Sequence, residues 1–320
     1  MLEIILSIVA GLVLFLYAVF SLSDIILKVV GDKVKKWLAR FTSNIFTAIL
    51  TGAVITTIVD SSSAVIIITI ILVNSRALTF RQAMGIVMGA NIGTTVSSQI
   101  IAMDVGQYSP LLLLAGFVLV FISKSDRVSN AGKIVLYFGV LFFGLFTMEK
   151  AVEPLRNEAY FAEWMDTVES PLYGAIAGAV TTLIVQSSSA TMGMAIILAK
   201  KGMLGLGGGI AIMLGAELGT CSDTLLATIK SNRQALKTGL FHLLFNFLSI
   251  VLGLIFFRPF LHLVALTAGS DHVERQVANA HMMFNIGGVL LFVGFVPLFE
   301  RLLNSLLPDK QVKDLPEPLK

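Results

Sequence analysis

The sequence contains one short polar motif twice, and each copy interrupts a long apolar stretch. Residues 59–64 read Val-Asp-Ser-Ser-Ser-Ala, and residues 185–190 read Val-Gln-Ser-Ser-Ser-Ala, 126 positions later. Backbone amides and hydroxyl groups are costly to place in hydrocarbon unless the protein itself uses them. A repeated polar cluster of this kind predicts a binding site inside a membrane protein.

The composition and the apolar runs support a membrane location. Hydrophobic residues make up 56% of the 320 residues and charged residues only 13%, against about 25% charged residues in soluble domains. Runs such as 4–22 and 240–257 are long enough for membrane helices, whereas barrel strands are shorter and alternate. We therefore expect an all-α polytopic membrane protein. The run 4–22 is expected to be a retained first helix because no basic signal-peptide region precedes it.

The serine motif belongs to a longer internal repeat. Aligning residues 51–98 with residues 177–224 needs no gap and gives 19 identities in 48 positions, which shared apolar composition does not explain. The same offset carries the first helix onto residues 130–153. The expected divisions are a first repeat over 1–126, a second repeat over 127–255, a C-terminal helical extension over 256–307 and a disordered cytoplasmic tail over 308–320.

Each serine motif is predicted to form the tip of a re-entrant helical hairpin. The segment of about 43–74 would be a helix about 45 Å long, too long for a hydrocarbon core of about 30 Å, whereas two arms of about 14 residues fit a hairpin. The second hairpin is expected over about 171–199. If both serine segments are hairpins and the N-terminus is outside, 17 of the 23 Lys and Arg residues fall on the inside. If both segments instead cross the membrane fully, only 14 of them fall on the inside. The positive-inside rule thus favours hairpins, two inverted-topology repeats and an inside C-terminus.

A glycine motif follows each predicted hairpin. The first copy is Gly-Ala-Asn-Ile-Gly-Thr-Thr over 89–95, and the second is Gly-Ala-Glu-Leu-Gly-Thr-Cys over 215–221. Two glycines four residues apart beside polar groups predict an interrupted transmembrane helix, over about 82–103 and about 208–229. The alternative is a face of small residues that packs closely against another helix.

The serine segments suit an anionic substrate. Helix starts expose free N–H groups and partial positive charge, which with hydroxyl donors favour a tetrahedral oxyanion such as phosphate. The predicted substrate ligands are Ser61, Ser62, Ser63, Ser187, Ser188 and Ser189. No Lys or Arg occurs between Phe41 and Ser75 or between Asn157 and Ala199, so a buried anion there needs co-bound cations. The predicted Na⁺ ligands are Asp60, Asn91, Thr94, Thr95, Gln186, Glu217, Thr220 and Asp223.

These motifs resemble those of the Na⁺/phosphate cotransporter family, which includes the type II renal and intestinal carriers. Residues 186–189 match its Gln-Ser-Ser-Ser segment, and residues 89–95 match its Gly-x-Asn-Ile-Gly-Thr-Thr motif in full. The resemblance implies Na⁺-coupled symport of inorganic phosphate across the cytoplasmic (inner) membrane. Na⁺ is then the coupling ion, and no other cofactor is expected. Many bacterial relatives add a PhoU-like domain, for which 320 residues leave no room.

Two positions depart from the family pattern. Asp60 replaces a glutamine, and Glu217 replaces an asparagine, with Cys221 after it in place of a threonine. Added negative charge opposes anion binding unless it is paired with a cation or protonated. Additional Na⁺, H⁺ coupling through Asp60 or Glu217, and a substrate other than phosphate therefore stay open, as does net export.

Two other functional classes are alternatives to a transporter. An intramembrane serine hydrolase would need one of the serines with His242 or His281, but the chain lacks a Gly-x-Ser-x-Gly nucleophile elbow. A non-transporting receptor with the same fold is the other. The expected partners are inorganic phosphate, Na⁺ and the lipid bilayer, without nucleic acid, and a homodimer stays open.

Overall fold

The computed structural model describes residues 2–103, 105–268 and 272–308. Within these ranges the regular secondary structure is entirely helical, and short connections join the helices. The elements in chain order are α1 (Leu2–Arg40), α2 (Ile45–Val59), α3 (Ser62–Asn74), α4 (Phe80–Ile101), η1 (Gly106–Tyr108), α5 (Ser109–Ile122), α6 (Asp126–Val152), η2 (Glu153–Asn157), α7 (Ala159–Val168), α8 (Pro171–Val185), α9 (Ser188–Lys200), α10 (Leu206–Gly219), α11 (Cys221–Leu226), α12 (Arg233–Ile255), α13 (Phe257–Ala265), α14 (Val273–Phe292), η3 (Val293–Phe295) and α15 (Val296–Leu306).

The lengths of these helices make the chain a multi-pass membrane protein. Within the described ranges, five helices are long and apolar enough to cross a membrane, and up to seven spans result if each of two bent helix pairs is one span. One bent pair is α7 with α8, which meet at 100°. The expectation of an all-helical polytopic membrane protein is therefore confirmed.

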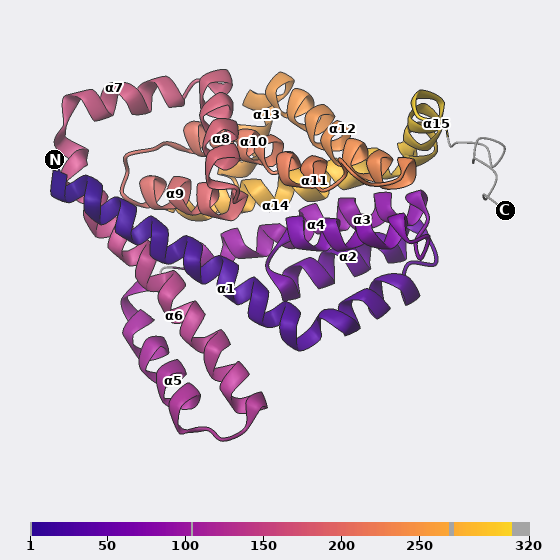
Figure 1. Ribbon diagram of the computed structural model, residues 1–320. Coiled ribbons are helices and arrows are strands. Elements are labelled where there is room, and N and C mark those ends of the chain that lie inside the picture. Colours follow the sequence, from indigo (N-terminus) through magenta and orange to yellow (C-terminus); the bar gives the residue numbers. More distant parts are fainter. Residues whose placement is uncertain (1, 104, 269–271, 309–320) are drawn as a thin grey trace.

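Two pairs of short helices occupy the segments where the hairpins were predicted. The α2 and α8 helices have 15 residues each, and α3 and α9 have 13 each. At 1.5 Å per residue these are about 20 to 22 Å long, shorter than a hydrocarbon core of about 30 Å. In Figure 1, α2 and α3 lie side by side along α4.

The break inside each pair has the same backbone conformation. Asp60 has φ 57° and ψ 31°, and Gln186 has φ 55° and ψ 32°. This left-handed conformation ends the first helix of each pair, because a right-handed helix needs negative φ and ψ at every residue. Ser61 and Ser187 are then extended, with φ −154° and −151°, and each begins the next helix as its N-cap.

The first glycine motif does not interrupt its helix, so that prediction is wrong. The α4 helix is unbroken from Phe80 to Ile101. A Cβ added to Gly89 would lie 1.9 Å from the carbonyl oxygen of Ile49 on α2. The motif therefore serves close backbone packing of α4 on α2, as small residues do between membrane helices.

The second glycine motif also packs closely, but its helix is divided. A Cβ on Gly215 would lie 1.8 Å from the carbonyl oxygen of Ala175 on α8. The segment predicted over 208–229 consists of α10, which ends at Gly219, and α11, which begins at Cys221. The division at Thr220 is slight, because its backbone stays in the right-handed helical region, with φ −64° and ψ −18°.

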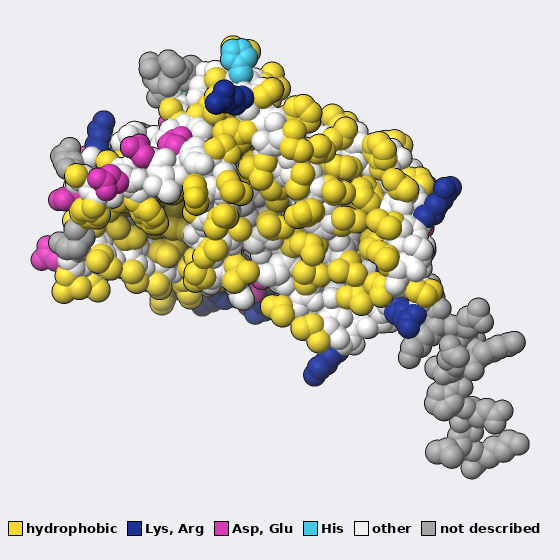
Figure 2. Space-filling model, turned by 90° about the horizontal axis from the view of Figure 1, so that it is seen from above, with side chains coloured by type: hydrophobic (Ala, Val, Ile, Leu, Met, Phe, Trp, Pro, Cys, Tyr) yellow, Lys and Arg dark blue, Asp and Glu magenta, His cyan; other side chains and the backbone are white. Residues whose placement is uncertain are grey.

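A broad apolar surface covers at least one face of the molecule (Figure 2). The α1 helix packs along α6 and α6 along α5, and the α5–α6 hairpin extends away from the other helices in Figure 1. On α5, Leu111 and Phe121 are 66% and 71% exposed. Figure 2 shows a wide hydrophobic field on one face, with acidic side chains gathered at its left end. Such a belt suits contact with lipid chains.

The C-terminal extension is part of the helical body. Its α14 helix packs against α4, α9, α10 and α12. The predicted division between the repeats, at 126 and 127, falls at the start of α6, and the division at 255 and 256 falls at the end of α12. The repeat units stay a prediction, and residues 309–320 of the predicted tail lie outside the described residues.

Candidate functional site

The serine motifs of both repeats line one cavity, which we call the serine cavity. Its volume is about 430 Å³, and α1 forms one of its walls. All six predicted serines line it, with five of the predicted cation ligands: Asp60, Thr94, Gln186, Thr220 and Asp223. The other three, Asn91, Thr95 and Glu217, are not among its lining residues.

Two helix starts face this cavity. Ser61 Oγ accepts a hydrogen bond from the N–H of Ala64, and Ser187 Oγ accepts one from the N–H of Ala190, both at 3.2 Å. Each cap satisfies one first-turn amide of α3 or α9, and the other first-turn amides have no partner within their helix. The cavity thus receives partial positive charge from two helix N-termini without any basic side chain.

Two carboxylates in the cavity bond to hydroxyl groups. The Asp60 carboxylate accepts a hydrogen bond from Ser97 Oγ on α4. Asp223 Oδ2 accepts one from Ser63 Oγ at 3.2 Å, which joins the serine motif of the first repeat to α11 of the second. Ser97 and Asp223 occupy equivalent positions of the two repeats, 126 residues apart, and so do Asp60 and Gln186. Each of these two pairs contains one carboxylate, which comes from the first repeat in Asp60 and from the second repeat in Asp223.

A third carboxylate, Asp24, was missed by the sequence analysis. It lies on α1 and lines the serine cavity beside Ser23. The signal that could have revealed it is its place at the end of the apolar run of the first helix, because acidic residues inside membrane helices usually serve a function.

Two of the predicted cation ligands are buried beside the cavity. Asn91 is 1% exposed and donates from Nδ2 to the side-chain oxygen of Asn246 on α12. The Thr95 hydroxyl donates to the backbone carbonyl of Ile92 at 2.7 Å. Both side chains thus have partners within the helical body.

Glu217 forms a buried polar cluster with α14. Its Oε1 lies 2.7 Å from Nε2 of His281 and accepts a hydrogen bond from Asn285 Nδ2 at 2.9 Å. His281 Nδ1 lies 2.7 Å from Ser98 Oγ on α4. The carboxylate that replaces an amide in the second glycine motif therefore has an imidazole partner of its own, and it is not among the lining residues of the serine cavity.

The histidines of α12 and α14 contact equivalent positions of the two repeats. Ser98 and Thr224 are equivalent positions of the repeat. His281 on α14 contacts Ser98, and His242 on α12 contacts Thr224 Oγ1 at 2.8 Å. Each histidine is thus bonded to a residue outside the paired serine motifs, so neither His242 nor His281 serves as the base that the hydrolase alternative requires.

The sequence of the chain shows its family. The profile of the Na⁺/Pi-cotransporter family matches residues 14–150 and 157–296. The chain belongs to the Na⁺/Pi-cotransporter family. This confirms the resemblance found in the motifs and places the chain among transporters rather than enzymes.

Several relatives within the Na⁺/Pi-cotransporter family cover most of the chain. YqeW of Bacillus subtilis (strain 168), named only as an uncharacterized protein, is 29% identical over 315 residues, which are 96% of this chain and 99% of YqeW. YjbB of Escherichia coli (strain K12), named for inorganic phosphate export, is 25% identical over 295 residues. That match covers 90% of this chain and 53% of YjbB, so the chain spans about half the length of YjbB.

A mammalian carrier matches a shorter part of the chain. The human sodium-dependent phosphate transport protein 2B is 32% identical over 147 residues, which are 44% of this chain and 19% of the human protein. No solved structure matches the chain.

The charges around the serine cavity define what this Na⁺/Pi-cotransporter chain can bind there. Its described lining includes the carboxylates of Asp24, Asp60 and Asp223, and no Lys or Arg. The described residues also hold no group of three or more His, Cys, Asp or Glu side chains suited to a metal ion. An anion in this cavity would therefore meet hydroxyl groups and helix ends, and its charge would have to be balanced by mobile cations.

Proposed function

We propose that the chain is a secondary active transporter that carries inorganic phosphate together with Na⁺ through the serine cavity. The observation that carries this proposal is the pair of equivalent helix starts, each with a left-handed residue followed by an N-cap serine, that line one cavity. Membership of the Na⁺/Pi-cotransporter family supports phosphate as the substrate.

The proposed phosphate site uses hydroxyl groups and backbone amides. A helix N-terminus carries about half a positive charge, and its free N–H groups donate to an oxyanion. Ser62 and Ser188 follow the N-caps directly and are 6% and 8% exposed. Their hydroxyls, with those of Ser63 and Ser189, would donate to the phosphate oxygens from two opposite repeats.

The proposed role of Na⁺ follows from the charge balance. Three carboxylates and a phosphate cannot share a cavity of about 430 Å³ without cations, because like charges at short range repel strongly. Asp60, Asp223 and the hydroxyls of Thr94 and Thr220 are hard oxygen ligands that suit Na⁺. We add Asp24 to this predicted set, because it lines the same cavity.

We further propose that the repeats have inverted topology, with α2–α3 and α8–α9 as re-entrant hairpins in a cytoplasmic membrane. Each of these helices is too short to cross a hydrocarbon core of about 30 Å. The excess of Lys and Arg in the segments assigned to the inside supports an outside N-terminus and an inside C-terminus. Labelling of single cysteines introduced at residues 3 and 301, with a membrane-impermeant reagent on intact cells, tests this orientation.

Export is a second candidate for the net direction of transport. The observation that favours it is the similarity to YjbB, which is named for inorganic phosphate export. The direction of a coupled carrier follows the gradients of its coupling ions, so import and export use the same site.

Radiolabelled phosphate flux in proteoliposomes tests the proposal. The account predicts that an inward Na⁺ gradient drives phosphate accumulation and that an outward Na⁺ gradient drives its release. A proton gradient in the absence of Na⁺ provides the control for H⁺ coupling. Equal phosphate flux when K⁺ or choline replaces Na⁺ would contradict Na⁺ coupling.

A further inference from the structure

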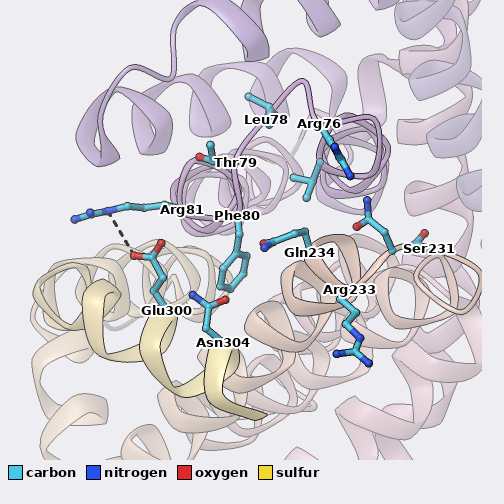
Figure 3. Close-up of a pocket in the computed structure, with 12 residues that line it drawn as sticks. Arg76, Leu78, Thr79, Phe80, Arg81, Ser231, Arg233, Gln234, Glu300 and Asn304 are labelled. Atoms are coloured by element: carbon cyan, nitrogen blue, oxygen red, sulfur yellow. Dashed lines mark ion pairs between the residues drawn. The ribbon is translucent and has the colours of Figure 1, made fainter. Parts of the chain in front are cut away.

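A second cavity, which we call the arginine cavity, lies at the end of the molecule where α3 joins α4. Its volume is about 760 Å³, and its walls come from the α3–α4 connection, the start of α12 and α15. Figure 3 shows Arg76 and Arg233 on the walls of this cavity near Gln234 and Ser231, and Arg81 extending away from them toward Glu300. It shares no lining residue with the serine cavity.

The charge of the arginine cavity is opposite to that of the serine cavity. Its described lining contains three guanidinium groups and one carboxylate, that of Glu300. Glu300 Oε2 lies 3.9 Å from Arg81 Nε, so two further guanidinium charges remain. Arg233 donates to the backbone carbonyl of Pro308, which is neutral. Guanidinium groups bind phosphate oxygens with parallel hydrogen bonds.

The backbone at Arg76 is unfavourable for an arginine. Arg76 has φ 62°, and the equivalent residue of the second repeat is Gly202, with φ 66°. Glycine adopts this left-handed conformation freely, whereas an arginine with its Cβ does not. An arginine that is kept in a conformation suited to glycine points to a use for its guanidinium group.

The corresponding corner of the second repeat holds an anionic group. Glu169 accepts hydrogen bonds from the N–H groups of Gly205 and Gly208 at the start of α10, at 2.5 and 2.7 Å. At the equivalent positions of the first repeat, Thr79 and Gln82 form a neutral capping box at the start of α4. The start of α10 in the second repeat is therefore capped by a carboxylate, whereas the start of α4 in the first repeat is capped by neutral groups.

The walls of the arginine cavity are held in place by hydrogen bonds. The fully buried Lys237 donates from Nζ to Asn304 Oδ1 at 2.7 Å, which leaves the Nδ2 group of Asn304 as a donor. The N–H of Asn232 donates to Asn74 Oδ1 at 2.8 Å, and its Nδ2 donates to the Asn74 carbonyl at 2.9 Å. These contacts tie the end of α3 to the start of α12.

We propose that the arginine cavity is a second phosphate-binding site, in which Arg76 and Arg233, the two arginines not paired with Glu300, supply the cations that hold a phosphate group. The phosphate belongs either to an anionic phospholipid headgroup or to soluble inorganic phosphate. A lipid can reach the site because α15, which forms one wall, exposes Leu298, Leu302 and Leu306 by 58%, 42% and 65%. This site does not depend on phosphate transport through the serine cavity.

Binding to the purified full chain in detergent tests the site with two probes. The first probe is phosphatidylglycerol, with phosphatidylcholine as the neutral comparison, and retained lipid is measured by native mass spectrometry. The second is inorganic phosphate, titrated in a Ser62→Ala/Ser188→Ala background so that the serine cavity contributes little. Arg76→Gly and Arg233→Gln remove cations from the arginine cavity, and Arg127→Gln removes one exposed charge on α6.

We expect Arg76→Gly and Arg233→Gln each to weaken binding of one probe about fivefold, since a surface cation contributes about that factor toward an anionic lipid. Loss of phosphatidylglycerol binding identifies a headgroup site, and loss of inorganic phosphate binding identifies a soluble ligand. Arg76→Gly should not lower the unfolding temperature, because glycine suits φ 62°, so misfolding cannot explain its effect. Unchanged binding of both probes, or an equal loss in Arg127→Gln, would overturn the proposal.

Discussion

Nε2 of His281 lies 2.7 Å from Oε1 of Glu217, and both side chains are 3% exposed. This contact joins α14, in the C-terminal extension, to the glycine motif of the second repeat. Ser98 on the other side of the imidazole extends the contact to α4. The extension thus holds together the two helices that follow the paired serine segments, and those helices present Thr94 and Thr220 to the serine cavity.

His281→Ala should lower the free energy of unfolding by about 3 kcal/mol, because it leaves the buried Glu217 carboxylate without its imidazole partner. The measurement is chemical unfolding in detergent micelles. His272→Ala is the matched control, since the His272 side chain is 52% exposed, and it should change stability by less than about 0.5 kcal/mol. An equal effect of the two substitutions would show that the Glu217 contact contributes little.

The pair Glu217 and His281 should also show strong coupling in a double-mutant cycle. Glu217→Gln and His281→Gln each remove one partner of the carboxylate–imidazole contact, whereas the double variant leaves two neutral amides in contact. We expect the double variant to be more stable than the sum of the single effects by about 1 to 3 kcal/mol. Additive effects would mean that the two groups act independently.

Gly89→Ala and Gly215→Ala should prevent close packing of α4 on α2 and of α10 on α8. The added methyl groups would lie 1.9 and 1.8 Å from backbone carbonyl oxygens, so the helices must separate. Gly287→Ala on α14 is the control, because nothing lies within 4 Å of its added methyl group, and a helical alanine should stabilise by about 0.5 to 1 kcal/mol. Yield and unfolding temperature in detergent distinguish them. A stable Gly89→Ala protein would contradict the packing role of the motif.

Asp60→Asn should lower the apparent affinity for Na⁺ more than the affinity for phosphate. Asparagine tolerates the left-handed φ of 57° and can still accept a hydrogen bond from Ser97, so the fold should be retained. Asp126→Asn, at the start of α6, is the control. The half-saturating Na⁺ concentration for phosphate flux is the measurement, and its constancy in Asp60→Asn would exclude Asp60 as a coupling residue.

The sequence predicted those features of the fold that depend on local chemistry. The length and polar midpoint of each serine segment predicted a helix break there, and the structure has one at Asp60–Ser61 and at Gln186–Ser187, where a helix end is followed by an N-cap residue. The glycine motif was misread at Gly89, because glycines four residues apart suit close packing as well as unwinding, and only the position of Ile49 on α2 decides between them.

Contacts between distant segments could not be predicted from the sequence. His281 and Asn285 are four residues apart and so share one face of α14, but nothing in the sequence indicates that this face meets Glu217 rather than lipid. In the same way, Asp24 is far from both repeated motifs in sequence, and only the packing of α1 brings it to the serine cavity.

Equilibrium binding of phosphate at varied Na⁺ concentration tests the central claim most directly, because it measures whether the serine cavity needs cations to hold an anion. By isothermal titration of the purified chain, we predict that phosphate binding strengthens as Na⁺ replaces choline. We also predict that Ser62→Ala with Ser188→Ala weakens the Na⁺-dependent part at least about tenfold, as expected for lost hydrogen bonds to a charged ligand. Ser305→Ala on the exposed side of α15 should leave it unchanged. Phosphate binding that is equally tight in choline and in Na⁺, or that is unaffected by removal of both serines, would contradict the account.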